Sequence, residues 1–236
     1  MLWVITGPTG SGKTALAEAE ALNSKRSIFN ADAYQFYREI PILSNQPAEA
    51  SAKNWSFLAD RTLSNPLSAG DFGRMAAEHL QSDSLWVGTG LYLGAALYGL
   101  DSDGRKGTPF QSKARVPFKM CVLDPDRKEL YRSLDKRVDD MMKKGALDEA
   151  RNVQRLMERG SVAVSNPVLK AIGLKHLLLH LGGTVGLEET LRLWKRDTRR
   201  LAKRQWTWLR KFCPPTRSEQ VQIEWISNLA SRRAFP

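Results

Sequence analysis

Short apolar runs alternate with stretches of helical spacing through the first half of the chain. The runs at residues 2–6, 27–30, 84–87 and 117–123 are bounded by turn formers and predict buried strands. Helices are predicted from Lys13 to about Asn23, after a capping box at 68–71, and over the apolar stretch 91–100. This alternation predicts an α/β fold of the P-loop type, with a parallel sheet and crossover helices.

The second half of the chain has a helical pattern nearly throughout. We expect helices at about 127–144, 147–158, 166–180 and 187–212 and in a short final piece, with a clear break at 181–186. The expected organisation is an α/β core over 1–125 and a mainly helical region over 126–236 that packs on it. Residues 101–115 are polar and rich in turn formers, which predicts a mobile loop or the scar of a lost insertion.

A formal net charge of +11 favours a polyanionic partner, and nucleic acid is the leading candidate. Cys121 and Cys213, the two cysteines, fit a reducing compartment and match no zinc or redox spacing. No signal peptide or long apolar span is visible. We therefore expect a soluble, cytoplasmic protein that is monomeric and has no membrane partner.

The stretch "GPTGSGKT", between a predicted strand and a predicted helix, fits the pattern of a phosphate-binding loop. Its glycines let backbone N–H groups turn inward, and the following helix adds its positive end. The predicted diphosphate ligands are Gly7, Pro8, Thr9, Gly10, Ser11, Gly12, Lys13 and Thr14, and the Thr14 hydroxyl is a candidate ligand for Mg²⁺.

ATP binding is a separate question. A P-loop enzyme that hydrolyses ATP needs an acidic residue at the end of a sheet strand to hold Mg²⁺, but the predicted strand 84–87 is followed by Gly88 and Thr89. Asp124 could supply one, although the sequence Asp-Pro-Asp at 124–126 is better explained as a helix-entry turn.

Basic residues crowd the last long helix. One seam is formed by Trp194, Thr198, Leu201, Gln205, Trp208 and Phe212, at alternating steps of four and three. Two cationic rows lie beside it, one of Lys195, Arg199 and Lys203 and the other of Arg196, Arg200 and Arg204. We expect the seam to dock on the core and both rows to face outward, toward RNA phosphates. Trp206 is either an exposed stacking platform or part of a wider seam.

Six stretches together resemble the tRNA dimethylallyltransferase (tRNA isopentenyltransferase) family. They are "GPTGSGKTALA", "NADAYQFYREI", "GTGLYLGAALYGL", "LDPDRKELYRSLDKRVDDMMKKGALDEA", "AIGLKHLLLHL" and "DTRRLAKRQWTWLRKF". The resemblance implies transfer of a dimethylallyl group from dimethylallyl diphosphate to N6 of adenosine 37, beside the anticodon of tRNA. The loop would then hold the leaving diphosphate, with Mg²⁺, and the anticodon stem-loop would be the RNA bound.

The resemblance also implies roles for single residues. Asp32 matches the family's catalytic aspartate and would accept a proton from the adenine amine, Thr89 would contact the reacting region, and Arg137 would reach the diphosphate. The expected RNA contacts are Ala33, Tyr34, Gln35, Arg199, Lys203, Arg204 and Gln205. Residues 34–37 would meet the extruded base. Without the resemblance, Asp32 could equally be a turn or cap residue, and Arg137 one cation on an amphipathic helix.

The sequence departs from the family pattern at several positions. Ala33 replaces a serine, Val87 replaces a glycine, and "LSNQP" and "WSFLAD" stand for Gly-Thr-Ala-Lys-Pro and His-His-Leu-Ile-Asp. Between Leu100 and Pro117 the family usually carries several tens more residues, including a helix that helps to hold tRNA. A compact enzyme, an enzyme for a different RNA and a degenerate homologue all fit, in that order.

Two other function classes stay open on the residues alone. One is a P-loop kinase or ATPase with Asp124 or Asp32 serving Mg²⁺, and the other is an RNA-binding protein without turnover. His176 and His180 are spaced like helical zinc ligands, but with no third ligand nearby they are expected to be helix-surface residues.

Overall fold

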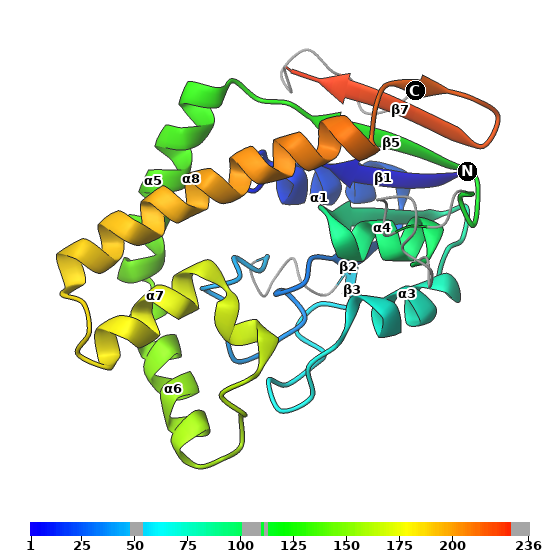
Figure 1. Ribbon diagram of the computed structural model, residues 1–236. Coiled ribbons are helices and arrows are strands. Elements are labelled where there is room, and N and C mark those ends of the chain that lie inside the picture. Colours follow the sequence, from blue (N-terminus) through cyan, green and yellow to red (C-terminus); the bar gives the residue numbers. More distant parts are fainter. Residues whose placement is uncertain (48–53, 101–109, 111–112, 228–236) are drawn as a thin grey trace.

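The computed structural model describes residues 1–47, 54–100, 110 and 113–227. A seven-stranded sheet runs through the described chain in the order β3-β2-β4-β1-β5-β7-β6 (Figure 1). The strands are β1 (Leu2–Thr6), β2 (Ser27–Ala31), β3 (Trp55–Ser56), β4 (Ser84–Gly88), β5 (Phe118–Leu123), β6 (Thr216–Arg217) and β7 (Val221–Ile226). All neighbouring pairs are parallel except β6 with β7. The predicted α/β fold with a parallel sheet is confirmed.

The parallel strands bring the loops that carry chemistry to one edge of the sheet. β1 lies between β4 and β5, and β2 pairs with the other side of β4. The residues that follow β1, β2 and β4 include the glycine loop, Asp32 and Thr89. Carboxyl ends of parallel strands form the usual ligand crevice of such sheets, so this edge is where a site is expected.

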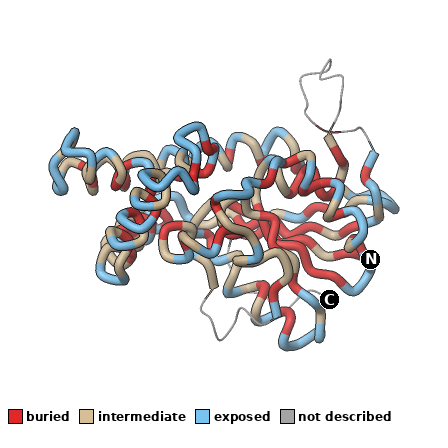
Figure 2. Tube along the Cα trace, turned by 90° about the horizontal axis from the view of Figure 1, so that it is seen from below, coloured by how far each residue is buried: buried red, intermediate tan, exposed pale blue. Residues whose placement is uncertain are grey.

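Helices cover both faces of the sheet. Helix α1 (Lys13–Ser24) packs on one face, where Ala17 and Ala21 join a buried cluster with Ile5. Helices α3 (Ala69–Ala77) and α4 (Leu91–Tyr98) pack on the opposite face. Buried residues concentrate along the strands, whereas the outer surfaces of the helices are exposed (Figure 2).

The second half of the chain builds the helices α5 (Arg127–Lys143), α6 (Ala146–Glu158), α7 (Ile172–Leu181) and α8 (Leu187–Phe212). α8 reaches from the α5–α7 group back to the sheet (Figure 1). The prediction of one helix over 166–180 is wrong, because a 3₁₀ turn, η1 (Pro167–Lys170), precedes α7. Ala171, with ψ 129°, is extended and separates the two.

The prediction that the final piece is helical is also wrong. "VQIEWI" alternates apolar and polar residues, a period of two that suits a strand, and β7 adds this segment to the sheet beside β5. The short strand β3 was not predicted either. Residues 216–226 thus return to the core sheet, so this part of the predicted mainly helical region, 126–236, belongs to the sheet.

Most of the predicted mobile loop, 101–115, lies outside the described residues. The described part is packed: Phe110 is buried, and its ring meets those of Trp208 and Phe212. Both cysteines are buried. Among the helices of the described ranges, none combines the length and apolarity that crossing a bilayer requires.

Candidate active site

The glycine loop joins the end of β1 to the start of α1. Gly10 and Gly12 have φ of +83° and +90°, a backbone conformation that glycine adopts at little cost. At Gly10 a Cβ would come within 2.7 Å of the Leu134 side chain of α5, so the loop also has no space there for a larger residue. α1 begins at Lys13, so the positive N-terminal end of this helix faces the loop.

Two cavities meet beside this loop. The loop cavity, of about 360 Å³, is lined by residues of the glycine loop, including Gly12, Lys13 and Thr14. The helix cavity, of about 280 Å³, extends to α7 and α8 and is lined by Tyr34 and Thr89 among others. Six residues line both cavities, Thr9, Asp32, Ser44, Asn45, Arg137 and Gln205. The two cavities are therefore adjacent on either side of this shared wall, and we refer to the pair together as the passage.

Lys13 lies on the wall of the loop cavity. Its Nζ donates to the carbonyl oxygens of Gly7, at 3.0 Å, and Pro8, at 2.9 Å. Burial lowers the pKa of Lys13 to about 8; nearby Asp32 opposes this shift and Arg137 adds to it. Lys13 forms no ion pair within the described chain. Its ammonium group is therefore available to bind an anionic ligand.

Arg137 of α5 reaches the loop from the other side. Its Nη2 donates to Thr9 Oγ1 at 2.8 Å, and burial lowers its pKa to about 10, against the pull of Asp32. The backbone N–H of Thr9 donates to Gln205 Oε1 of α8 at 2.7 Å. Thr9 is thus held by α5 through its side chain and by α8 through its backbone.

Asp32 follows β2 and lies where the two cavities meet. Its Oδ1 accepts the N–H of Tyr34 at 3.0 Å, which orients the carboxylate. Within the described chain no hydrogen bond reaches Oδ2. Asp32 therefore has one oxygen fixed and one available.

Thr89 follows β4 and lines the helix cavity. Its Oγ1 hydroxyl donates to the Gly7 carbonyl at 2.5 Å.

The turn around "LSNQP", which the sequence marks only as a departure from the family pattern, also lines the passage. Asn45 has φ +55°, and Gln35 Nε2 donates to its carbonyl at 2.9 Å. Glu149 of α6 accepts the N–H groups of Ile42, at 2.6 Å, and Leu43, at 2.9 Å, and burial raises the pKa of its carboxyl. The sequence features that could have identified this turn are the stretch "LSNQP" itself and Glu149, the glutamate that ends "GALDE". Gln35, expected to contact RNA, is committed to this turn.

The seam of α8 is rotated from its predicted position. The buried residues are Thr190, Trp194, Thr198, Ala202, Trp206 and Leu209. Trp206 belongs to the wider seam, and its Nε1 donates to Asp124 Oδ1 at 2.6 Å. Asp124 lines neither cavity. The Mg²⁺ role considered for Asp124 thus lacks support, and Asp126 caps α5 as the turn interpretation requires.

The expectation that both cationic rows of α8 face outward is wrong for Lys195 and Arg199 of the first row. Lys195 pairs with Asp139 at 2.6 Å, and Arg199 pairs with Asp135, because α5 packs alongside α8 with its acidic side facing it. Lys203 is exposed, and Arg204 is exposed at the wall of the helix cavity. The cations open to a ligand are thus concentrated in the second half of the helix.

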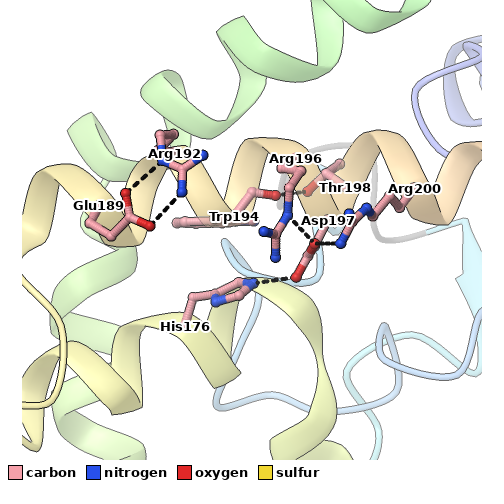
Figure 3. A network of polar contacts seen from close by, with 8 residues as sticks. All are labelled: His176, Glu189, Arg192, Trp194, Arg196, Asp197, Thr198 and Arg200. Atoms are coloured by element: carbon pink, nitrogen blue, oxygen red, sulfur yellow. Dashed lines mark hydrogen bonds and ion pairs between the residues drawn. The ribbon is translucent and has the colours of Figure 1, made fainter.

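Asp197 joins α8 to α7 (Figure 3). Its Oδ1 accepts from Arg196, at 2.9 Å, and from Arg200, at 3.3 Å, while its Oδ2 lies 3.1 Å from His176 Nε2. His176 is buried, so the prediction that it lies on the helix surface is wrong. Burial lowers the pKa of His176. The described residues contain no cluster of three His, Cys, Asp or Glu side chains that could hold a metal.

Phe36 and Tyr37, expected near an extruded base, are buried instead. Tyr37 Oη accepts the N–H of Leu67, which fixes this ring in the core. Ala33 and Tyr34 do line the helix cavity, so part of the predicted contact segment remains accessible. The helix cavity is also lined by three residues of "AIGLK" to which the sequence analysis assigned no role: Ala171, Ile172 and Gly173.

Comparison with known proteins gives two family models along the chain. The model described as Isopentenyl transferase matches residues 1–83, and that described as IPP transferase matches residues 102–212. Among curated relatives, the tRNA dimethylallyltransferase of Salinibacter ruber is 30% identical, covering 95% of this chain and 91% of the relative. That of Parvibaculum lavamentivorans is also 30% identical, with coverage of 88% and 87%.

Solved structures share the fold. A full-length tRNA isopentenylpyrophosphate transferase from Bacillus halodurans gives a TM-score of 0.74 at 24% identity, covering 96% of this chain and 89% of that one. A eukaryotic dimethylallyltransferase acting on tRNA gives 0.78 at 20% identity, with coverage of 98% and 75%. The Salinibacter alignment spans 301 residues, more than the 236 of this chain, so the relative has positions with no counterpart here.

Proposed function

We propose that this chain, which belongs to the tRNA dimethylallyltransferase family, transfers a dimethylallyl group from dimethylallyl diphosphate to N6 of adenosine 37 in tRNA. The observation that carries the proposal is the position of Asp32 on the wall shared by the two cavities. A diphosphate on the glycine loop and an adenine in the helix cavity would face each other across this carboxylate.

The loop cavity supplies the groups that the leaving diphosphate needs. As the allylic C–O bond breaks, negative charge grows on the phosphate oxygens. Preorganised backbone N–H groups and cations stabilise such developing charge well in a partly buried site. Lys13 and Arg137 approach the loop from different elements, and both are buried enough to have lowered pKa values.

The helix cavity supplies the nucleophile's side of the reaction. The lone pair of the adenine amine is delocalised into its ring, so N6 gains nucleophilicity as a base removes its proton. We assign this role to Asp32 Oδ2, with Oδ1 held by Tyr34. A bond forms between N6 and C1, the allylic carbon of the dimethylallyl group, as the bond between C1 and the diphosphate oxygen breaks. The N6 proton goes to Asp32, and the diphosphate leaves with the electron pair of the broken C–O bond.

Magnesium fits the residues of the loop cavity. The Thr14 hydroxyl, which would be its protein ligand, lines this space. Mg²⁺ is usually bound through one or two protein oxygens together with phosphate oxygens and water, so no dedicated protein cage is needed. When bound, Mg²⁺ would add positive charge beside the departing diphosphate.

The exposed cations of α8 suit the anticodon stem-loop. Arg204, which lines the helix cavity, and its exposed neighbour Lys203 present charge to RNA phosphates, and Tyr34 lines the same cavity. We also propose that the protein acts as a monomer.

The experiment is incubation with labelled dimethylallyl diphosphate, Mg²⁺ and unmodified tRNA. We expect label in the RNA, and we expect Asp32→Asn to slow transfer by about 10²- to 10⁴-fold while leaving pyrophosphate binding intact. Asp83→Asn, at an exposed carboxylate, is the control. ATP turnover without labelled RNA would point instead to a P-loop kinase or ATPase. Salt-sensitive RNA binding with neither reaction would mean a protein without turnover.

A further inference from the structure

Gln205 belongs to the helix expected to contact RNA, yet its side-chain oxygen is used inside the protein. Gln205 Oε1 accepts the backbone N–H of Thr9 at 2.7 Å, across 196 residues of sequence. An N–H group can only donate, so this contact fixes which end of the amide carries the oxygen. The residue also lines both cavities.

The segment that Gln205 holds has little stiffness of its own. Thr9 immediately precedes Gly10, and Gly12 also has positive φ, so the local backbone has a wide choice of conformations. A binding loop of this kind gains affinity when contacts from outside hold it in its bound shape. Arg137 supplies one such contact, through Thr9 Oγ1, and Gln205 supplies another.

We propose that Gln205 is a positioning residue for the diphosphate cradle: through the Thr9 N–H it holds the glycine loop in its binding shape. The identity of the ligand in this inference rests on the proposed function, but the anchoring itself does not. The helix that faces RNA with Lys203 and Arg204 thereby also shapes the site for the other substrate.

The first test follows hydrogen–deuterium exchange of the loop amides in the protein without ligands. Gln205→Met keeps the length of the side chain and removes the acceptor, so exchange over residues 7–12 should become faster. Gln205→Glu keeps an acceptor oxygen and should restore the protection. Thr207→Val, at an exposed position one half-turn further along α8, is the matched control and should leave exchange unchanged.

The second test measures the binding of pyrophosphate and of an unmodified anticodon stem-loop RNA. Gln205→Met should weaken pyrophosphate binding about three- to tenfold and change RNA binding less than twofold. Gln205→Glu should also bind pyrophosphate poorly, because its carboxylate repels the ligand although the loop is protected. This split between loop protection and pyrophosphate affinity is not expected of a residue that only stabilises the fold.

Three outcomes would overturn the inference: wild-type loop exchange in Gln205→Met, unprotected loop amides in Gln205→Glu, or a loss of RNA affinity with pyrophosphate affinity intact. The two proposals can fail separately. Loss of loop protection in Gln205→Met without prenyl transfer by the wild type would reject only the reaction. Prenyl transfer with exchange insensitive to Gln205 would reject only the anchoring.

Discussion

The passage and the second half of α8 use charge in opposite settings. In the passage, Lys13, Asp32 and Arg137 are partly or largely buried around one space, and burial lowers the pKa of both cations. On α8, Lys203 and Arg204 are exposed and form no ion pair within the described chain. Charges in a partly buried site interact strongly and are little affected by salt, whereas exposed charges are screened by salt.

Under the proposed function, this contrast separates the residues that carry out the reaction from those that attach the RNA. A buried charge aimed at one ligand has no substitute, so a single change there should have a large effect. Exposed cations contribute to RNA binding through counterion release, each by a similar and modest amount. The two regions can therefore be distinguished by the size of a substitution's effect and by its dependence on salt or pH.

The largest effect on ligand binding is expected from Gly10→Ala. The new methyl group would enter a backbone conformation unfavourable for alanine and would collide with Leu134, so pyrophosphate binding should weaken on the order of 30-fold in calorimetric titration. Gly183→Ala is the control, since Gly183 also has positive φ, +73°, but a methyl group added there would meet no atom within 4 Å. Pyrophosphate binding that survives Gly10→Ala would show that the loop is not the anion site.

An intermediate effect is expected from pH acting on Lys13. Its pKa is lowered to about 8 in the free protein, and a bound diphosphate favours the charged form, so binding requires proton uptake above this pH. Between pH 7 and pH 9 pyrophosphate binding should weaken about tenfold relative to Lys13→Met. That variant carries the same titration of the ligand but no ammonium. Identical pH profiles for the two proteins would contradict the role of Lys13.

The smallest effects are expected on α8, where they sharpen the comparison within one helix. Lys203→Met should lower RNA affinity about threefold and reduce the slope of log affinity against log salt by about 0.9. Lys195→Met should change RNA affinity less than twofold, because Asp139 already neutralises Lys195. Its cost in unfolding free energy should stay below about 1 kcal/mol, as for other partly exposed ion pairs. Equal losses of RNA affinity would mean that the ion pair opens to receive RNA.

Local sequence determined the elements that local physics can specify. The strand–glycine loop–helix unit follows from an apolar run, glycines that tolerate positive φ and an Ala/Leu/Glu-rich helix. Asp126 begins α5 as a cap because its side chain satisfies free N–H groups near it in sequence. The positions of Asp32 and Thr89 after strands also followed, because parallel strands bring their carboxyl ends to one edge.

Tertiary packing decided which side of each element is used. The predicted seam of α8 included Trp208 and Gln205, but packing on α5 and the sheet buried Trp206 and left Gln205 to bind the glycine loop. A helix repeat fixes which residues share a face, not which face meets a neighbour, so Lys195 and Lys203 look alike until α5 supplies Asp139 to one of them. The passage itself is built from segments distant in sequence, and only their packing brings its walls together.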